Sequence, residues 1–524
     1  MLFSSPVFLC CFLPLSLISF YLLASINKAA AKVLLIAISL LFYGWMSSRF
    51  LPLLIGSVVI NYFIGRQIQI ETRRGDERLA AMLRIAGVAG NLALLIYFKY
   101  TNFLLDNFNQ VARTNFHIVS IVLPLGISFF TFQRIAYLVD CARGEIQDAS
   151  FLDFAASSLL FPQLISGPIV FYKELAPQIA SSQLGSRGGR NLTVGLVIFA
   201  IGLFKKIVIA DNVSYISDPV FDAAAHGSTL SFAAAWIGVL SYTVQLYFDF
   251  SGYSDMAIGV ARMFGLLLPL NFHSPLRATS IIEYWRRWHI TLNRFMVRYF
   301  FQPISMQFTR VSMTAGLSGE RAFLLSIIFP VFLTFVVLGI WHGAGWTYVL
   351  FGVLHASYVS VNEVWRDARR RWRKAAGRKG KPPAPSIGER LVSLGLTLLC
   401  VFVANVMFRA DTVSVALSFY RSMFGLASNA DFAGFYRFEA LVFVVAGWII
   451  IFLFPNTQQI VAAYRPSVNW RLWRDVAIPA SARFIQWYPN TVGLACVGVI
   501  LAADVTATII EMSREPAQFI YFQF

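Results

Sequence analysis

The chain of 524 residues is 57% hydrophobic and only 13% charged, whereas a soluble protein carries about 25% charged residues. This composition excludes a soluble domain and indicates a polytopic membrane protein. We interpret the formal net charge of +17 as basic cytoplasmic loops, because lysine and arginine gather on that side of a membrane. No zinc-finger spacing or stripe of basic and aromatic residues favours nucleic acid.

The first part of the chain alternates apolar stretches with basic loops. Residues 1–24 are longer than the apolar part of a signal peptide and have no positive residue ahead of them, so they predict a retained first span. Lys28 and Lys32 follow and indicate a cytoplasmic loop. The arginines of residues 65–84 indicate a second one. Further spans are expected near residues 33–46, 50–64, 85–105 and 118–139.

The stretch Phe151–Ile169 is apolar but interrupted by Pro162, Gly167 and Pro168. Proline ends a helix, and non-helical backbone at membrane depth is tolerated only where protein buries it or it lines a cavity. We therefore predict a broken or re-entrant helix. It is followed by a span near residues 191–210, an external acidic loop over residues 211–222 and a returning span over residues 230–262.

Residues 263–321 are semi-polar and rich in arginine and aromatic side chains, which places them at the cytoplasmic interface or within the protein. After them, two apolar segments flank the run Ile340–Trp346, which contains His342. The dense basic run that follows predicts a cytoplasmic loop at about residues 365–390, near anionic lipid. The last spans are expected near residues 391–408, 438–455 and 490–510. We predict one all-α membrane domain over residues 1–524, with about 11–12 crossings.

Ionisable side chains at membrane depth are the candidate chemistry of this chain, because such groups are costly there and mark pathways or reaction centres. Gly343 and Gly345 let backbone or a substrate approach the ring of His342. A histidine suits proton abstraction from a hydroxyl because its unperturbed pKa lies close to neutral pH. His289, in the aromatic and basic segment, is the second candidate. The alternative for His342 is a buried histidine that hydrogen-bonds between helices.

Two carboxylates also lie at membrane depth, Asp249 and Asp255. Six residues apart on a helix, they point about 120° apart, so they do not form an acid/base pair. We expect each to orient a neighbour or to hold helices together. Asn405 and Arg409 end another span, where an interface anchor is the simpler interpretation.

Several common catalytic motifs are absent from the sequence. It contains no H-E-x-x-H, no G-x-x-x-x-G-K-[ST] and no G-x-S-x-G, and its cysteines form no C-x-x-C pair. The sequence therefore favours neither a metal site, nor an ATP-driven pump, nor a serine hydrolase.

Seven stretches in order resemble the membrane-bound O-acyltransferase (MBOAT) family, in particular its bacterial alginate O-acetyltransferase branch. Each stretch alone is a weak signal, whereas the ordered set is specific and runs the length of the chain. The stretches are PLGISFFTFQRIAYLVD (Pro124–Asp140), FPQLISGPIV (Phe161–Val170), QLYFDFSGYSDMAIG (Gln245–Gly259), EYWRRWHITL (Glu283–Leu292), IWHGAGWTYVLFGVLHA (Ile340–Ala356), FRAD (Phe408–Asp411) and REPAQFIYFQF (Arg514–Phe524).

The resemblance implies a ring of helices, some of them broken, around a central tunnel. In that family an acyl thioester from inside meets a hydroxyl acceptor from outside. His342 resembles the essential membrane histidine, expected to act as general base, and His289 the second characteristic polar position. Three arginines are expected to meet the phosphates of the donor: Arg286, Arg287 and Arg298. Four residues are expected to line the substrate tunnel: Asp249, Asp255, Trp341 and Asn405.

The same resemblance implies a donor and a partner. The acetylating branch is thought to use cytoplasmic acetyl-CoA as a substrate, with no bound cofactor. It passes the acetyl group to a periplasmic SGNH-type partner that modifies a polysaccharide, which implies a multi-pass protein of the bacterial inner membrane. One departure concerns the acceptor. Val297 stands where the alginate branch has an aspartate, and no double glycine follows.

Two alternatives remain open. Within the family, the donor is another thioester, such as D-alanyl carrier protein or a longer acyl chain. Outside it, the chain is a transporter or flippase, with the broken segment and the membrane carboxylates along a substrate path. That alternative predicts an inverted internal repeat, which the sequence does not show.

Overall fold

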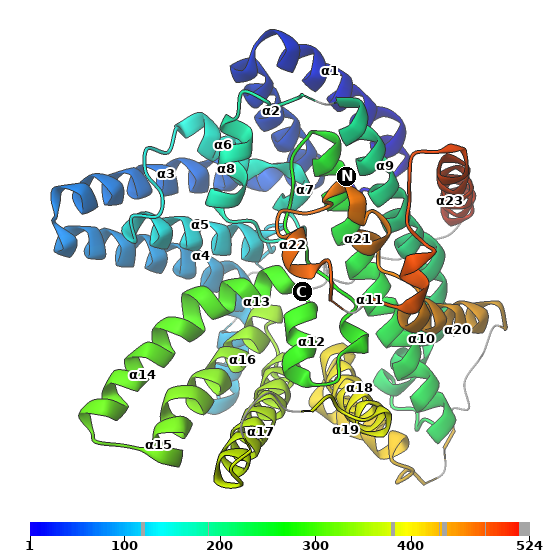
Figure 1. Ribbon diagram of the computed structural model, residues 1–524. Helices are drawn as coiled ribbons and strands as arrows, with labels where there is room; N and C mark the ends of the chain where they lie inside the picture. The colour runs from blue at the N-terminus through cyan, green and yellow to red at the C-terminus, as the bar shows by residue number, and fades with distance from the viewer. Residues whose placement is uncertain are drawn as a thin grey trace. The chain divides into compact units, whose positions relative to one another are not determined.

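The computed structural model describes residues 1–116, 121–186, 188–378, 383–428, 430–431, 438–476 and 478–512. Within these ranges all regular secondary structure is helical, which confirms the predicted all-α class (Figure 1). The start of the span expected at residues 118–139 and the motif Arg514–Phe524 lie outside the described residues. The same is true of residues 379–382 in the predicted basic loop.

Helices long and apolar enough to cross a membrane confirm a polytopic membrane protein. The described residues contain seven of them: Phe8–Ile26, Lys28–Arg74, Glu77–Ala112, Gly188–Ala225, Gly319–His342, Ile387–Arg409 and Thr491–Ile509. Some helical segments are longer than predicted. The spans expected at residues 33–46 and 50–64 both fall within Lys28–Arg74. The predicted number of crossings and the central tunnel stay predictions.

The chain divides into two compact units, of which the first comprises residues 1–208, 249–271 and 455–523. It contains the end of α11 (Phe232–Met263) and twelve further helices. These are α1 (Leu13–Ile26), α2 (Lys28–Ser47), α3 (Leu51–Arg74), α4 (Glu77–Ala112), α5 (Ile127–Ala142), α6 (Phe151–Leu159), α7 (Phe161–Leu164), α8 (Tyr172–Ala180), α9 (Gly188–Leu203), α21 (Thr457–Ile460), α22 (Trp470–Trp473) and α23 (Thr491–Met512).

Local signals in the sequence set the helix ends of this unit. The Asn27 side chain accepts hydrogen bonds from the backbone N–H groups of Ala29 and Ala30 and begins α2. Gly75, in the left-handed region at φ 82°, ends α3. Such caps satisfy backbone groups that a helix leaves without a partner. Between the helices, the Phe161 ring packs against those of Phe8 and Phe42, at centroid distances of 6.4 and 5.1 Å.

The interrupted stretch at residues 151–169 is broken, as predicted. Helix α6 ends at Leu159, the short α7 follows, and residues 165–171 are irregular. Residues 154–171 are buried throughout, which agrees with the rule that irregular backbone in a membrane protein is enclosed by protein. A Cβ at Gly167 would lie 2.3 Å from the carbonyl oxygen of Pro162, so only glycine fits this turn.

The second unit comprises residues 209–248 and 272–454. In its described residues it contains the first part of α11 and ten further α-helices. These are α10 (Asp211–Ala225), α12 (Ile281–Arg287), α13 (Ile290–Met296), α14 (Gln302–Thr314), α15 (Gly319–Phe323), α16 (Phe329–His342), α17 (Trp346–Ala375), α18 (Ile387–Arg409), α19 (Val413–Met423) and α20 (Phe438–Leu453).

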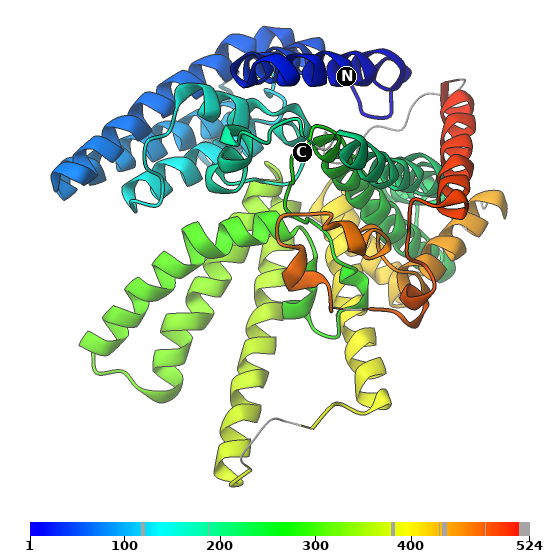
Figure 2. The ribbon, with the colours of Figure 1, turned by 45° about the horizontal axis from the view of Figure 1, so that its top comes forward.

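The acidic stretch predicted as a loop is helical, so that prediction was wrong, whereas the predicted basic loop is helical in its first part. The acidic stretch over residues 211–222 forms α10, because the π-helix Phe204–Ala210 carries the helical backbone into it. The basic run after residue 365 continues α17 to Ala375 (Figure 2). In that extension Arg370 and Arg371 both pair with Asp367. Their hydrogen bonds hold the pKa of the Asp367 carboxyl below its ordinary value, so acid would weaken this end of the helix.

Residues 263–321 form a chain of short elements instead of one helix. After α11 the backbone is irregular and mostly buried as far as α12, and residues 288–289 separate α12 from α13. A π-helix, Val297–Phe301, then leads into α14, whose side chains are largely exposed. The two halves of the segment therefore differ: residues 263–296 lie mostly within the protein, and the later residues lie at its surface.

Candidate functional site

His342 is the last residue of α16, and the run of small residues after it turns the chain into α17 (Figure 1). Gly343 and Gly345 are extended there. A Cβ at Gly343 would lie 2.2 Å from the Tyr348 ring, so the turn depends on glycine. Gly339 and Gly352 let α16 and α17 approach closely, since a Cβ on Gly339 would lie 2.8 Å from the Gly352 Cα. The two apolar segments therefore hold His342 in a tight helical hairpin.

Aromatic rings surround His342 on several sides. Its side chain is only 3% exposed. The ring of Phe351, on α17, lies 5.6 Å from the imidazole centroid, and that of Phe408, on α18, lies 5.3 Å away. Both contacts are edge-to-face. These rings restrict the imidazole orientation and exclude water around it.

His289 is fully buried between α12 and α13. Its backbone lies in the left-handed region at φ 44°, which is uncommon for a residue other than glycine and costs about 1–3 kcal/mol. The imidazole stacks on the Phe272 ring at a centroid distance of 6.4 Å. A strained backbone at a buried histidine is typical of functional positions.

Trp341 connects the two histidines. Its indole lies 5.0 Å from the His342 ring and 6.2 Å from the His289 ring, between centroids. The indole is 5% exposed. The structure thus brings His289 next to Trp341 and His342, although the sequence places it more than fifty residues before them.

Asn405 lies on α18, one turn before Phe408. Its Nδ2 donates a hydrogen bond of 3.0 Å to the Thr243 hydroxyl on α11. At the end of α18, Arg409 lies 3.6 Å from Asp218 and 3.7 Å from Asp222, both on α10. Asn405 therefore holds α18 and α11 together, and its predicted place in a tunnel stays a prediction.

The three arginines predicted to meet donor phosphates have different surroundings. Arg286 is exposed, while Arg287 is 8% exposed and forms an ion pair with Glu283 on the same helix. Arg298 packs over the Tyr299 ring, with its guanidinium 5.5 Å from the ring centroid. The Arg287 charge is already neutralised by Glu283, which makes it the least available of the three. Their role in donor binding stays a prediction.

Asp249 and Asp255 belong to the first unit, and both are paired. Asp249 lies 2.7 Å from the Lys206 ammonium. Asp255 receives a hydrogen bond of 2.6 Å from Lys205, one of 2.6 Å from Thr457 and one of 2.8 Å from Gln458. A buried carboxylate with these partners holds helices together, which favours the structural alternative over a place on a substrate path.

His355 is a second buried imidazole near His342 that the sequence analysis did not assign. It is 2% exposed, and the Phe351 ring lies 4.6 Å from it and also contacts His342. The Trp285 Nε1–H donates a hydrogen bond of 3.1 Å to His355 Nδ1, so a neutral ring carries its proton on Nε2. Its sequence signal was a histidine within the apolar segment that follows His342.

The arrangement can perform proton transfer in a dry, aromatic enclosure. An imidazole that is fixed by edge-to-face rings is pre-positioned to take a proton from a hydroxyl. Among the described residues, no group of three histidine, cysteine, aspartate or glutamate side chains could hold a metal ion.

Comparison with known proteins relates the chain to acyltransferases. Residues 90–380 match the sequence profile of MBOAT, the membrane-bound O-acyltransferase family. The chain is 38% identical over 453 residues to a peptidoglycan O-acetyltransferase of Helicobacter pylori, covering 81% of this chain and 80% of that one. It is 36% identical over 438 residues to the probable alginate O-acetylase AlgI of Pseudomonas aeruginosa, covering 82% and 76%. A teichoic acid D-alanyltransferase of Streptococcus thermophilus is 27% identical over 264 residues, covering 50% and 62%.

Proposed function

The chain belongs to the membrane-bound O-acyltransferase family and is an O-acyltransferase, and from this premise we propose its reaction. It moves an acetyl group from cytoplasmic acetyl-CoA across the bacterial inner membrane. The group serves the O-acetylation of an exported polysaccharide through a periplasmic SGNH-type partner. The observation that carries this proposal is the pair of buried imidazoles, His342 and His289, on one indole ring.

In the proposed step His342 acts as general base. A ring nitrogen of the neutral imidazole takes the proton of an acceptor hydroxyl, and the hydroxyl oxygen attacks the thioester carbonyl carbon. The carbon–sulfur bond then breaks, and the CoA thiolate leaves with the proton that His342 has collected. Acid–base help of this kind contributes about 10²–10⁴-fold. His289 lies across Trp341 and positions the thioester or stabilises the charge that develops on its carbonyl oxygen.

The names of the relatives support an acetyl donor and a glycan acceptor. A peptidoglycan O-acetyltransferase and probable alginate O-acetylases match most of the chain. Val297, which departs from the alginate pattern, lies on the π-helix before α14 with 36% of its surface exposed. The proposal therefore names a glycan hydroxyl, on peptidoglycan or an exported polysaccharide, and not alginate alone. The D-alanyl donor is the alternative that the teichoic acid relative supports.

The experiment measures both products of thioester cleavage, which are the free CoA thiol and the transferred acetyl group. The protein is reconstituted in liposomes loaded with an O-acetylable glycan oligosaccharide and the purified SGNH partner, and acetyl-CoA labelled in the acetyl group is added outside. We expect free CoA thiol and acetylated glycan to appear in equal amounts. A D-alanyl carrier thioester in place of acetyl-CoA should give neither free carrier thiol nor D-alanylated glycan.

A transporter or flippase would give a different result. It would move label or glycan across the membrane without releasing CoA thiol. That result would contradict the proposal, as would thiol release with the D-alanyl donor alone.

A further inference from the structure

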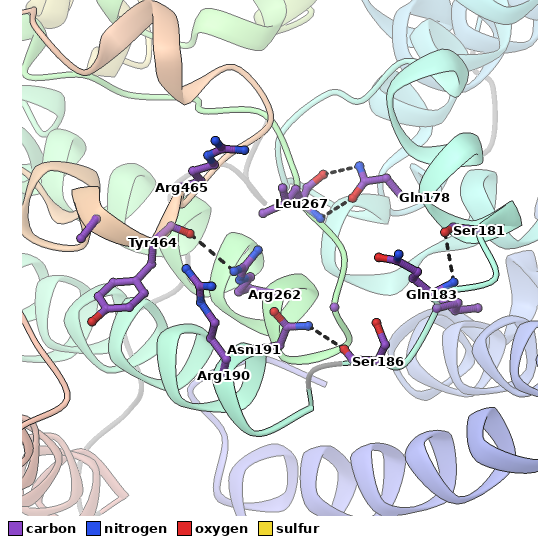
Figure 3. A pocket seen from close by; sticks show the side chains of 13 residues that line it. Gln178, Ser181, Gln183, Ser186, Arg190, Asn191, Arg262, Leu267, Tyr464 and Arg465 are labelled. Carbon is purple, nitrogen blue, oxygen red and sulfur yellow. Dashed lines mark hydrogen bonds between the residues drawn. The ribbon is translucent and has the colours of Figure 1, made fainter.

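The first unit contains a polar cavity of about 670 Å³ that the acyl-transfer proposal does not use (Figure 3). Segments far apart in the sequence form its walls: the loop after α8, the start of α9, the end of α11 and the residues before α22. Three of its lining residues are arginines: Arg190, Arg262 and Arg465. None of the described lining residues is an aspartate or a glutamate. The cavity therefore concentrates positive charge that no lining carboxylate offsets.

Arg262 is the buried member of the three. It lies in the last turn of α11 and is only 9% exposed. One terminal nitrogen donates a hydrogen bond of 3.5 Å to the Tyr464 carbonyl oxygen, while the Nε–H makes no hydrogen bond within the described residues. A guanidinium has five N–H donors, and leaving one buried without an acceptor costs about 1–3 kcal/mol. Arg262 thus retains the capacity for a further acceptor.

Arg190 and Arg465 are the exposed members. The Arg190 guanidinium lies over the Tyr464 ring, 5.4 Å from its centroid. Arg465, the next residue after Tyr464, adopts the left-handed region at φ 49°. In Figure 3 the Arg190 and Arg262 side chains lie near each other beside Tyr464. Two guanidinium groups of like charge repel unless an anion lies between them.

The neutral polar residues of the cavity form hydrogen bonds with backbone groups that fix its walls. The Gln178 side-chain oxygen accepts a hydrogen bond of 2.8 Å from the Leu267 backbone N–H. Its side-chain nitrogen donates one of 3.0 Å to the Leu267 carbonyl oxygen. The Asn191 side-chain amide donates a hydrogen bond of 3.2 Å to the Ser186 carbonyl oxygen. The first turn of α9, which carries Arg190, adds backbone N–H groups without helical partners and the positive end of the helix dipole. These hydrogen bonds therefore fix the walls of the cavity, and the three arginines can bind a ligand.

Contacts of α1 and of the first residue of α2 place the cavity at the predicted cytoplasmic end of this unit. The Lys28 ammonium, just after the first span, donates at 2.6 Å to the oxygen of Leu184, a lining residue. The Tyr21 hydroxyl, near the end of α1, donates a hydrogen bond of 2.6 Å to the carbonyl oxygen of Met263. Met263 is the residue after Arg262. The sequence assigns the Lys28 loop to the cytoplasm.

We propose that this arginine cavity, defined by Arg190, Arg262 and Arg465, binds a phosphate-bearing anion from the cytoplasmic side. Phosphate oxygens accept several charge-assisted hydrogen bonds at once, which suits three guanidinium groups without a carboxylate. The phosphate belongs either to a soluble nucleotide, as in the donor thioester, or to the headgroup of an anionic phospholipid. The proposal does not require acyl transfer.

The test uses two probes on the full chain in nanodiscs of phosphatidylcholine. Adenosine 3′,5′-bisphosphate is titrated by calorimetry, and phosphatidylglycerol, added as a minor component, is counted by native mass spectrometry. Arg262→Gln and the double variant Arg190→Gln/Arg465→Gln are compared with Arg66→Gln, an exposed arginine on α3 that does not line the cavity. We expect the affinity for one of the two probes to fall about tenfold or more in both cavity variants and to stay unchanged in the control.

Each outcome decides the proposal. A loss confined to the bisphosphate identifies a soluble phosphate, and a loss confined to phosphatidylglycerol identifies a lipid headgroup. If neither probe is weakened in the Arg190→Gln/Arg465→Gln variant, whose positions are exposed and whose fold is checked by thermal denaturation, the proposal is overturned. Failure here leaves the acyl-transfer proposal untouched, because CoA release is measured separately.

Discussion

Two buried histidines share the Phe351 ring, but their partners differ. His355 accepts a hydrogen bond from the Trp285 indole and packs at a centroid distance of 5.0 Å from it. His342 lies at the helix end, next to the glycine turn and the indole that leads to His289. A histidine already engaged by a tryptophan donor is typical of a structural role. This difference favours His342 over His355 as the base in the proposed reaction.

His355→Phe tests that assignment. The variant keeps a ring of similar size but removes the acceptor of the Trp285 N–H, and an unsatisfied buried donor costs about 1–3 kcal/mol. We expect a lower thermal unfolding midpoint and a rate of CoA release per folded molecule within a few-fold of the original. An unchanged midpoint with abolished CoA release would instead make His355 the base.

Asp255→Asn tests the structural role of the buried carboxylates. The change leaves the Lys205 charge without its counter-ion in a site where the Asp255 side chain is 7% exposed. Breaking a buried ion pair on one side costs about 3–5 kcal/mol, so we expect a large fall in the unfolding midpoint. Asp222→Asn is the matched control, because that carboxylate is 62% exposed. Equal effects of the two variants would rule out the interpretation.

At the scale of elements, the turn between α16 and α17 positions the site. Gly343 lies directly after His342, with the Tyr348 ring against it. Its neighbours leave no space for a methyl group, and backbone that shifts here carries the imidazole with it. A displacement of about 1 Å at a reacting group is enough to lower a rate 10²-fold.

Gly343→Ala is therefore expected to impair transfer more than stability. Overpacking of a close contact costs about 1–3 kcal/mol, while CoA release should fall by about 10²-fold. Gly90→Ala on α4 is the control, since a Cβ there would meet nothing within 4 Å. Normal CoA release by Gly343→Ala would show that the turn does not set the imidazole position.

The elements also show what the sequence could predict. Apolar length identified most spans, and the prolines and glycine of residues 151–169 identified the broken helix, because those signals are local. Helix α10 and the last part of α17 were missed, since charged residues were assigned to loops although the helical backbone continued through them.

Long-range pairings were beyond local reasoning. Lys205 and Asp255 are 50 residues apart, and the sequence does not show which residue each of them pairs with. His289 was a candidate because of its aromatic and basic segment, whereas its left-handed backbone and its contact with Trp341 needed the structure. His355 was visible in the sequence, but only the Trp285 hydrogen bond distinguishes it from His342.

At the scale of the whole molecule, the chain is a polytopic membrane enzyme whose described part contains seven candidate spans. Its family makes it an O-acyltransferase, while the acetyl donor, the glycan acceptor and the SGNH-type partner are our proposals. All of them require that the thioester be cleaved by this protein. They also require that one imidazole, on His342, remove the acceptor proton.

The most direct measurement is the rate of CoA thiol release by His342→Gln in the reconstituted system, with saturating acetyl-CoA and acceptor. His226→Gln, an exposed position on the surface of the second unit, is the control. We predict that His342→Gln retains its unfolding midpoint and loses about 10²-fold or more of the rate, while His226→Gln keeps it. A folded His342→Gln that releases CoA at the original rate would contradict the account.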